Sequence, residues 1–476
     1  MINRYFRTLR AVARAIMMCG VALIGFGSAS ADVTIPDTPA GRAMSAWLEA
    51  FNSGDRARLD DYFKKYEPAK HADDFMVFRD RVGGFDLISI EKSEPNRIVF
   101  LLKERNSERR AVAKFQVSDS DPLGGTPPGG APLGGTPPAG APLGGTPPQV
   151  TSSRVQGIFD GAAVIGFDID AATRRHVIDG AIAMLDEFYV FPAVAKKMGI
   201  AVRGRAKRGE YDSVTDGDAF ARLLAAHFQE VSHDKHIFVS FSPTQLPEDS
   251  APPNRDAVAR QREAMRDANC AFEKVEHLKG NIGYLKFNGF ADPEICAPTA
   301  IAAMNFLANV DALIFDLRQN GGGDPKMVAL LCSYLFEHPT HLNDLWTRKG
   351  DETEQFWTLS YVPGKRLPSI PVYVLTSHRT FSGAEEFTNN LKVLKRATIV
   401  GEVTGGGAHP VGGHRIDDRF TLGVPFARAI NPITKTNWEG VGVEPDVKVS
   451  AEDALTTAQE LAAKEIASRR AAKPSS

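Results

Sequence analysis

The sequence predicts an α/β domain in its second half, preceded by a helical subdomain and, before that, by an α+β domain. After residue 270, short apolar segments alternate with amphipathic helical segments, as in an α/β unit. From residue 170 the apolar residues recur with a helical period. Residues 40–117 instead have a pattern typical of helices followed by strands in which apolar and polar residues alternate. We therefore expect these parts: a signal peptide (1–31), an α+β accessory domain (32–165), a helical subdomain (166–247), an α/β core (270–450) and a C-terminal helix with a tail (451–476).

The N-terminal residues 1–31 have the pattern of a secretory signal peptide. Several arginines precede an apolar run at 15–26, and Ala-Ser-Ala at 29–31 matches a cleavage site before Asp32. The run is too short to span a membrane comfortably, and no later run approaches ~20 apolar residues. A net charge of -2 with mixed signs gives no reason to expect nucleic acid as a partner. The sequence thus predicts an exported protein, periplasmic or secreted, without a stable membrane span after signal removal.

Residues 40–64 open the accessory domain as helices, because apolar side chains recur at i, i+3, i+4 and i+7. The residues on this face are Met44, Trp47, Leu48 and Phe51. Alternating strands are expected at 85–90, 97–103, 110–117 and near 155–159. The opening segment Trp-Leu-Glu-Ala-Phe-Asn-Ser-Gly-Asp resembles the first helix of the cone-shaped domains related to nuclear transport factor 2, which implies that fold here.

A tandem repeat interrupts this domain at 122–148, where Pro-Leu-Gly-Gly-Thr-Pro-Pro recurs at a fixed period. So much proline and glycine with few apolar residues cannot form a core, so we expect a disordered surface insertion. Its repeats are too short and too rich in glycine to be solenoid units.

The helical subdomain contains an apolar stripe between Val177 and Phe188, followed by a helix at 218–230 and a connector at 247–256. In the core we expect strands at 282–287, 312–317, 372–375, 398–401 and 420–424, and helices at 298–307, 327–335, 384–394 and 451–469.

Three cysteines follow the signal peptide, so at most one disulfide can form within the chain. Cys270 and Cys296 are the expected pair, because both flank predicted surface segments; whether they are oxidised stays open. Cys332 lies in an apolar helix and is expected to be a buried thiol.

Ser382 lies where the predicted strand at 372–375 leads into the helix at 384–394. This position suits a nucleophile, because a helix N-terminus offers unpaired amides and a positive dipole to a developing oxyanion. The alternative is a simple capping box, since Ser382 and Glu385 match that pattern.

Four motifs occur in a fixed order in the second half of the chain. They are Asp-Leu-Arg-Gln-Asn-Gly-Gly-Gly at 316–323, Thr-Phe-Ser-Gly-Ala-Glu at 380–385, Gly-Glu-Val-Thr-Gly at 401–405, and Trp-Glu-Gly-Val-Gly-Val-Glu-Pro-Asp at 438–446. Together they resemble the tail-specific, or C-terminal processing, serine peptidases of family S41, in the branch of tricorn protease and interphotoreceptor retinoid-binding protein. The resemblance spans residues 170–450 and implies a crotonase-like (ClpP/crotonase) core without a PDZ domain.

The same resemblance implies the roles of three residues. Ser382 matches the nucleophile, His236 the general base within Asp-x-His, and Glu439 the carboxylate that orients the base. In the branch with a Ser/Lys dyad a lysine stands where this chain has Gly407, which points to the histidine-dependent branch. Tricorn-like relatives place a serine directly before the histidine, whereas this chain has Lys235, so the coupling of Glu439 to His236 is left open.

Other residues compete for these roles or complete the site. The rival histidines are His233, His378, His409 and His414. The oxyanion donors are expected to be the amide of Gly383 and one from Gly321 or Gly322, with a mere tight turn as the alternative for the glycine run. Glu385 and Glu386 are expected only as helix-start carboxylates.

The sequence predicts an exported serine peptidase that hydrolyses peptide bonds of polypeptides. Neither a metal nor a cofactor is expected, because no histidine and cysteine cluster has zinc-ligand spacing and HExxH is absent. The main alternative is a non-catalytic lipid- or retinoid-binding protein on the same scaffold. A third hypothesis is that the domain at 32–165 is an independent binding module that dominates the function.

Overall fold

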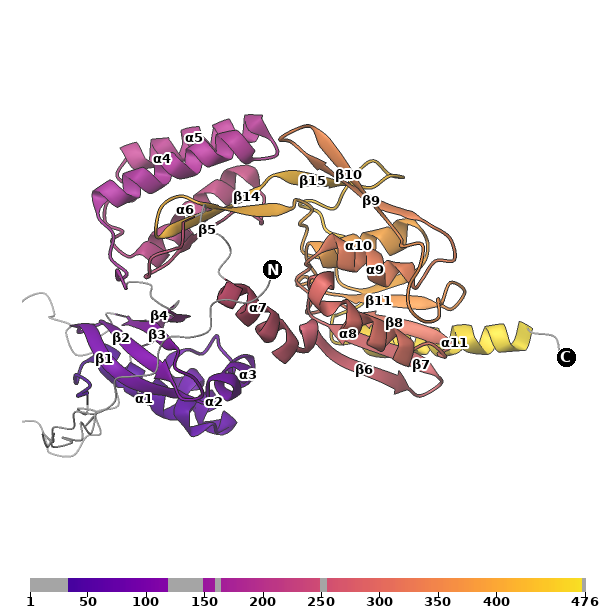
Figure 1. Ribbon diagram of the computed structural model, residues 1–476, viewed down its shortest axis with the longest axis horizontal. Coiled ribbons are helices and arrows are strands. Elements are labelled where there is room, and N and C mark those ends of the chain that lie inside the picture. The colour runs from indigo at the N-terminus through magenta and orange to yellow at the C-terminus, as the bar shows by residue number, and fades with distance from the viewer. Residues whose placement is uncertain (1–32, 119–148, 159–163, 249–254, 473–476) are drawn as a thin grey trace, which may run out of the picture. The chain divides into compact units, whose positions relative to one another are not determined.

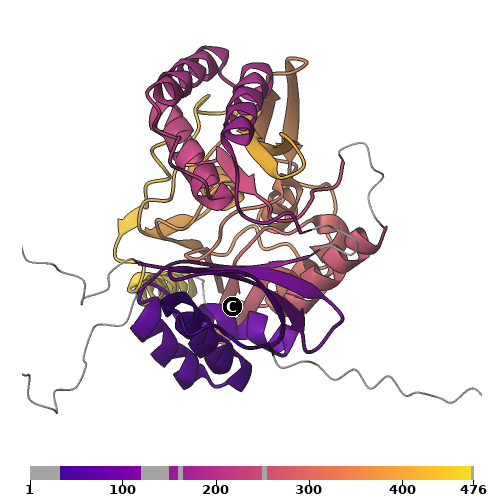
Figure 2. The ribbon, with the colours of Figure 1, turned by 90° about the vertical axis from the view of Figure 1, so that its left-hand side faces the viewer.

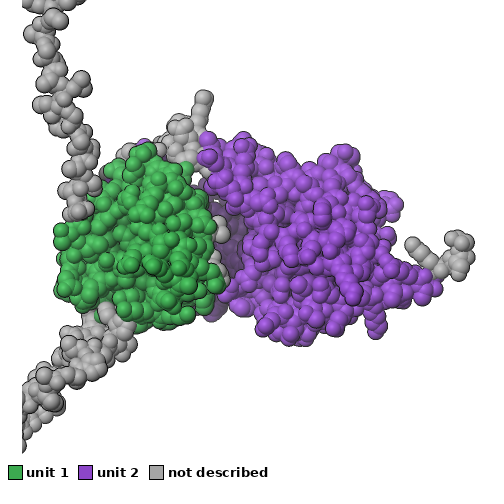
Figure 3. Space-filling view, turned by 90° about the horizontal axis from the view of Figure 1, so that it is seen from below, with its two compact units in different colours: residues 1–160 green, residues 161–476 purple. Residues whose placement is uncertain are grey.

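The computed structural model describes residues 33–118, 149–158, 164–248 and 255–472. The chain divides into two compact units, residues 1–160 and 161–476 (Figure 3). The expected signal peptide and the Pro/Gly repeat lie outside the described residues. The finer division of the second unit into a subdomain at 166–247 and a core at 270–450 stays a prediction.

The first unit is an α+β domain in which three helices precede an antiparallel sheet. The elements are α1 (Pro39–Ser53), α2 (Arg56–Tyr66), α3 (Asp73–Val82), β1 (Phe85–Glu94), β2 (Arg97–Glu104), β3 (Arg110–Val117) and β4 (Val150–Gly157). The strands pair in the order β1-β2-β3-β4. Thr38 and Asp55 cap the first two helices, each accepting a hydrogen bond from a first-turn amide.

The helices of this unit cover one face of its sheet (Figure 2). Trp47 and Phe51 of α1 pack on Phe85, with Trp47 also against Phe115 of β3. The predicted apolar helix face therefore does form the core of this unit. Two elements differ from the prediction: α3 was not expected, and β4 begins five residues earlier than the strand predicted near 155–159. A fold related to nuclear transport factor 2 stays a prediction.

The second unit is built around a six-stranded sheet with the order β16-β12-β11-β8-β7-β6. All neighbouring pairs are parallel except β6 and β7. The strands are β6 (Phe272–Leu278), β7 (Ile282–Phe287), β8 (Ala312–Asp316), β11 (Val372–Thr376), β12 (Thr398–Gly401) and β16 (Val447–Lys448). Every residue of β8 and β11 is buried, as expected for the central strands of a parallel sheet covered on both faces.

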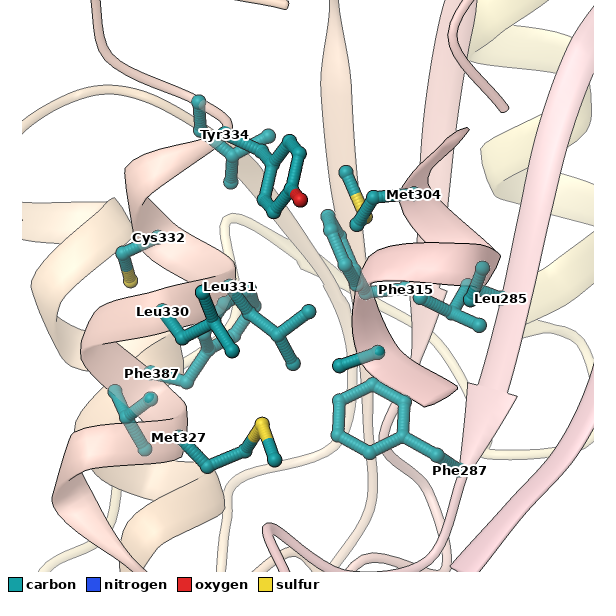
Figure 4. Packing of buried hydrophobic residues seen from close by; sticks show 14 of the residues in the cluster. Leu285, Phe287, Met304, Phe315, Met327, Leu330, Leu331, Cys332, Tyr334 and Phe387 are labelled. Atoms are coloured by element: carbon teal, nitrogen blue, oxygen red, sulfur yellow. The ribbon is translucent and has the colours of Figure 1, made fainter. Parts of the chain in front are cut away.

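Helices cover both faces of this sheet. On one face lie α8 (Pro293–Phe306), α9 (Pro325–Ser333) and α10 (Gly383–Val393), and on the other lies α11 (Ala454–Ala472). Figure 4 shows Leu331 of α9 and Phe387 of α10 packed toward Phe315 of β8. On the opposite face, alanines of α11 pack against Ile314 and Tyr373. This mixed α/β architecture agrees with the predicted class, while the crotonase-like topology stays a prediction.

A second group of elements lies beside the main sheet (Figure 1). It comprises α4 (Ala171–Phe188), α5 (Pro192–Lys207), α6 (Gly217–Ser232), β5 (Phe238–Phe241), β13 (Val411–Arg415) and β14 (Phe420–Pro425). The strands pair in the order β13-β14-β5, with Phe241 opposite Phe420 and Val239 opposite Leu422. Since β13 and β14 follow β12 in sequence, this pairing joins the early helical segment to the later part of the chain.

Several elements of the second unit escaped the sequence prediction. They are α5, β6, β13, β16, the helix α7 (Arg255–Asp267), and the small sheet of β10 (Glu352–Trp357), β9 (His341–Thr347) and β15 (Ala427–Ile430). The connector predicted at 247–256 is wrong at its end, because α7 begins at Arg255. The helix predicted from residue 298 begins at Pro293, so Pro298 lies inside it. Of the overlooked strands, β9, β10 and β13 are rich in polar residues or glycine, so their apolar pattern is weak.

Cys270 and Cys296 form a disulfide, which confirms the expected pair, and the Cys332 thiol is buried as predicted. None of the helices in the described ranges is long and apolar enough to cross a membrane.

Candidate active site

Ser382 lies at the start of α10, directly after a turn that leaves the carboxyl end of β11. The turn is held against the loop after β8: the Ser377 hydroxyl donates to the carbonyl of Arg318 at 2.6 Å, and that of Thr380 to the carbonyl of Leu317 at 2.8 Å. The Phe381 amide also donates to the carbonyl of Asn320 at 3.0 Å. Two adjacent parallel strands thus fix the position of Ser382.

The backbone of Ser382 is strained, with φ 53° and ψ -119°. An ordinary N-cap is extended, and a non-glycine residue with positive φ costs of order 1–3 kcal/mol unless its surroundings impose it. The capping box predicted from the sequence is present, with the Glu385 carboxylate accepting the Ser382 amide at 2.9 Å. The cap and the strained turn therefore occur together, and capping alone does not explain the strain.

Glu385 is fully buried and does more than start a helix. Besides the Ser382 amide, its carboxylate accepts the amides of Gly406 at 2.6 Å and Gly407 at 2.8 Å, and the hydroxyl of Thr404. Burial raises the pKa of Glu385, while these donors act in the opposite direction. One carboxylate thus links the Ser382 turn to residues 404–407, a contact that the sequence pattern did not predict.

The glycine run after β8 packs directly on the Ser382 turn. A Cβ atom on Gly322 would lie 2.8 Å from the Ser382 Cβ and 2.5 Å from the Gly383 nitrogen. The amide of Gly322 donates to the Asn320 side chain at 2.9 Å, and the amide of Gly321 to the carbonyl of Asn288 at 3.3 Å. The prediction of these two amides as oxyanion donors is therefore not supported.

Gly323 and Gly383 have amides that remain available. Phe290 pairs with Gly323 in a parallel bridge: its amide donates to the carbonyl of Gly322, and its carbonyl accepts the amide of Asp324. The amide of Gly323 therefore points away from Phe290. A Cβ on Gly383 would lie 2.9 Å from the Gly323 nitrogen, so the two residues are close neighbours. Among the described residues, neither amide donates a hydrogen bond.

His236 lies just before β5 and packs against the Ser382 turn through Phe381. Its ring is 4.6 Å from the ring of Phe381, between centroids, and its Cε1 would contact a Cβ on Gly407. The side chain is buried, and neither ring nitrogen has a hydrogen-bond partner, so His236 is not bonded to Ser382. Burial lowers its pKa to about 4, so the imidazole is neutral, and able to accept a proton, at pH 7.

Glu439 lies near the His236 segment but does not contact the His236 side chain. Its Oε2 accepts the Ala408 amide at 2.5 Å and lies 3.4 Å from Nδ1 of His409, while its Oε1 is buried without a partner. Burial raises the pKa of Glu439 to about 7. Within the described residues, no hydrogen bond joins Glu439 to His236.

The other predicted histidines fall into two groups. His233 ends α6, His378 is exposed and pairs with Glu402 at 3.2 Å, and His414 stacks on Phe188. His409 is different: it is buried, and its Nδ1 lies 2.7 Å from Oδ2 of Asp234. Sequence inspection named His409 only as a rival base and did not assign Asp234 a role of its own.

Asp234, His409 and Glu439 present ligand atoms within 4.8 Å of one another, which is close enough for a metal ion in principle. The 2.7 Å contact of His409 with Asp234 is, however, a normal hydrogen bond. The cluster is thus joined by its own hydrogen bond, and its chemistry fits proton sharing.

Comparisons with known proteins agree with the motifs. Residues 281–449 match the model of peptidase family S41, and residues 171–275 match the N-terminal domain of peptidase S41 in eukaryotic IRBP. A Streptomyces coelicolor protein named as a homologue of tricorn protease is 27% identical over 205 residues, which is 41% of this chain and 15% of that protein. This chain therefore spans less than two thirds of the length of that curated relative.

Solved structures resemble this chain only loosely. A lipoprotein from Streptococcus agalactiae is 14% identical, covering 62% of this chain and 96% of its own, with a TM-score of 0.42. The photosystem II D1 C-terminal processing protease is 16% identical, covering 61% of this chain and 97% of its own, with a TM-score of 0.38. Because both TM-scores are low, the assignment rests on the two family models, whose matches together span more than half of the chain. By these matches, the chain belongs to peptidase family S41.

Proposed function

We propose that the chain is a serine peptidase that hydrolyses peptide bonds in polypeptides, with Ser382 as nucleophile, His236 as general base and Glu439 as a supporting carboxylate. The observation that carries the proposal is the strained turn of Ser382 beside the available amides of Gly383 and Gly323. Such a turn exposes a hydroxyl next to amides that can bind an oxyanion. The two family models support the same reaction class.

In this mechanism the Ser382 oxygen attacks the scissile carbonyl carbon while its proton moves to His236. The Nδ1 of His236 faces Asp234, so Nε2 is the atom free to take the proton. The negative oxygen accepts hydrogen bonds from Gly383 and Gly323, and each such donor contributes ~3 kcal/mol to transition-state stabilisation. His236 then protonates the leaving amine, and water hydrolyses the acyl-enzyme by the reverse sequence.

Binding of substrate has to bring His236 and Ser382 together, because they are not hydrogen-bonded in the free chain. Catalytic contacts are often long in unliganded enzymes and tighten in the substrate complex. The base lies just before β5 and the nucleophile at the start of α10, so the movement that joins them takes place between these two elements.

Replacing Ser382 with Ala tests the proposal. We expect Ser382→Ala to lower the cleavage of unfolded polypeptides by ~1000-fold or more, because the nucleophile is lost, and to abolish labelling by a fluorophosphonate probe. The exposed Ser360→Ala variant is the matched control and should keep both signals. Undiminished cleavage by Ser382→Ala would overturn the mechanism, and tight retinoid or fatty-acid binding without labelling would support the lipid-binding alternative.

We also propose that the protein is exported and that the main sheet has the crotonase-like topology implied by its motifs. The signal-like residues 1–31 and the disulfide of Cys270 with Cys296 support export, since structural disulfides persist in oxidising compartments. N-terminal sequencing of the protein recovered from outside the cytoplasm should start at Asp32. A mature chain that still begins at Met1 would contradict export by this signal.

A further inference from the structure

Asp234 is buried between two histidines and divides its carboxylate oxygens between them. Its Oδ1 accepts the backbone amide of His236 at 3.0 Å and lies 3.8 Å from Nδ1 of the His236 ring. Its Oδ2 lies 2.7 Å from Nδ1 of His409 and accepts the Tyr189 hydroxyl at 3.2 Å. Asp234 is only 1% exposed, and Tyr189 and His409 hold it in place.

His409 extends this chain of contacts to Glu439. The Nδ1 of His409 lies 2.7 Å from Asp234 and 3.4 Å from Oε2 of Glu439, so a single nitrogen serves two carboxylates. The ring packs edge-on against Phe191, with 5.4 Å between centroids. His409 and Asp234 are 175 residues apart in sequence, so the later part of the chain completes the surroundings of Asp234.

Lys235 does not connect Glu439 with His236. Its Nζ donates to the carbonyl of Gly405 at 2.6 Å, so the side chain is directed at the Gly-rich segment. The described contacts therefore leave one continuous path from Glu439 to the ring of His236, and it runs through His409 and Asp234.

We propose that Asp234 and His409 are positioning residues that orient His236 and link it to Glu439. The inference rests on the proposed function. It explains how Glu439 acts on His236 without a hydrogen bond to it. When His236 takes the proton of Ser382 it becomes an imidazolium, and the Asp234 carboxylate, which faces Nδ1, stabilises that charge and fixes the tautomer. The Nδ1 proton stays on His236, and His409 holds Asp234 by donating its own Nδ1 proton.

The 3.8 Å separation of Asp234 and His236 is longer than a hydrogen bond, so the contact has to shorten when the ring becomes charged. The neighbouring charged and titratable groups are His409 and Glu439 on the later segment, Tyr189 at the end of α4, and Glu385 on α10. Unlike these groups, Asp234 contacts both His236 and His409.

The titration of His236, followed by NMR, tests the proposal without relying on activity. We expect Asp234→Asn to move the His236 titration to lower pH by about one unit or more, because a facing negative charge is removed. His409→Gln should move it in the opposite direction, because His409 opposes the charging of His236. A His236 titration unchanged in both variants would overturn the proposal.

Kinetics provide the second test. Asp234→Asn should lower kcat by about 100-fold or more with little change in KM, since a misoriented base affects the chemical step. Asp344→Asn is the matched control, because it removes a second Asp–His pair, with His341 at 2.6 Å, outside this cluster. An Asp234→Asn enzyme with wild-type kcat would also overturn the proposal.

Two further variants keep the proposal falsifiable if Asp234→Asn fails to fold. Asp234→Glu retains the charge and should recover most of the NMR behaviour and part of kcat, and His409→Gln leaves Asp234 in place. If His409→Gln folds and behaves as the wild type in titration and in kcat, the proposed link through His409 is wrong. Failure of the proposed function would give a different result. In that case Ser382→Ala would cleave polypeptides as fast as the wild type, whatever the His236 titration shows.

Discussion

The nucleophile side and the base side of the site differ in how firmly their residues are held. On the nucleophile side, the Ser382 turn is fixed by backbone and side-chain hydrogen bonds, and Glu385 accepts four hydrogen bonds. On the base side, both ring nitrogens of His236 lack a partner, although the ring is buried. Under the proposed mechanism, the difference means that Ser382 and its amides are preorganised, whereas His236 reaches its working position only when substrate binds.

Gly322→Ala should disrupt the Ser382 turn and have the largest effect on stability and labelling. The added Cβ would lie 2.5 Å from the Gly383 nitrogen and 2.6 Å from the Phe381 carbonyl oxygen, and φ at Gly322 is +98°. Because backbone cannot move aside cheaply, we expect a loss of about 2–4 kcal/mol in unfolding free energy and no probe labelling. Denaturant unfolding and fluorophosphonate labelling would measure both.

The matched control for this change is Gly321→Ala. A Cβ on Gly321 would have no atom within 4 Å, so the protein should remain as stable as the wild type to within ~0.5 kcal/mol. Equal stability of the two variants would mean that the close packing of the glycine run on Ser382 is not important.

Gly407→Ala should affect the base side with a smaller cost in stability. Its Cβ would lie 2.3 Å from the Phe381 ring and 2.5 Å from Cε1 of His236, both side-chain atoms that can rotate away. We expect a loss of ~1 kcal/mol in unfolding free energy but a fall in kcat of ~10-fold or more, because His236 is displaced. If stability falls as far as in Gly322→Ala while kcat per folded molecule is unchanged, the contrast between the two sides is wrong.

Glu386→Gln should change stability only at high pH, and it tests the contrast between Glu385 and Glu386 within α10. Unlike Glu385, Glu386 has a carboxylate oxygen without a hydrogen bond, and burial raises its pKa from 4.5 to about 8. Between these values the native chain keeps a proton that the unfolded chain has released, so stability falls as pH rises through this window. Gln stays neutral, and the variant should therefore be ~1–3 kcal/mol more stable than the wild type at pH 8.5 and no different at pH 4.5.

Denaturant unfolding at several pH values would measure this effect. Glu444→Gln, at an exposed residue paired with Lys448, is the control and should show the wild-type dependence on pH. A Glu386→Gln variant whose stability falls with pH as steeply as the wild type would contradict the assignment to Glu386.

Much of the fold was predictable because the signals were local. The strand and helix that flank Ser382 follow from apolar period and helix-start residues, and the structure places both within one or two residues of the prediction. The pairing of Cys270 with Cys296 also agreed with the prediction. By contrast, α7 contains few apolar residues among many charged ones, and β9 and β10 carry mixed side chains.

The site was only partly predictable, because its decisive contacts are long-range. Ser382, His236 and Glu439 were identified from motifs, but which glycine amides are available depends on hydrogen bonds that no motif encodes, such as that from Gly322 to Asn320. The contact of Asp234 with His409 depends on how two distant segments meet. Motifs and their spacing therefore identify candidate site residues, but only the tertiary structure shows which of these residues are in contact.

The short ladder between β5 and β14 has a further consequence. Side chains alternate between the faces of a strand, so a slip of one residue would turn Val239 and Phe241 toward solvent and shift the attached imidazole by about 3.3 Å. Such a displacement is as long as a reactive contact, so an enzyme in the wrong register would be folded yet inert. In the proposed mechanism, the register of these four residue pairs therefore sets the distance between the Ser382 hydroxyl and the His236 imidazole.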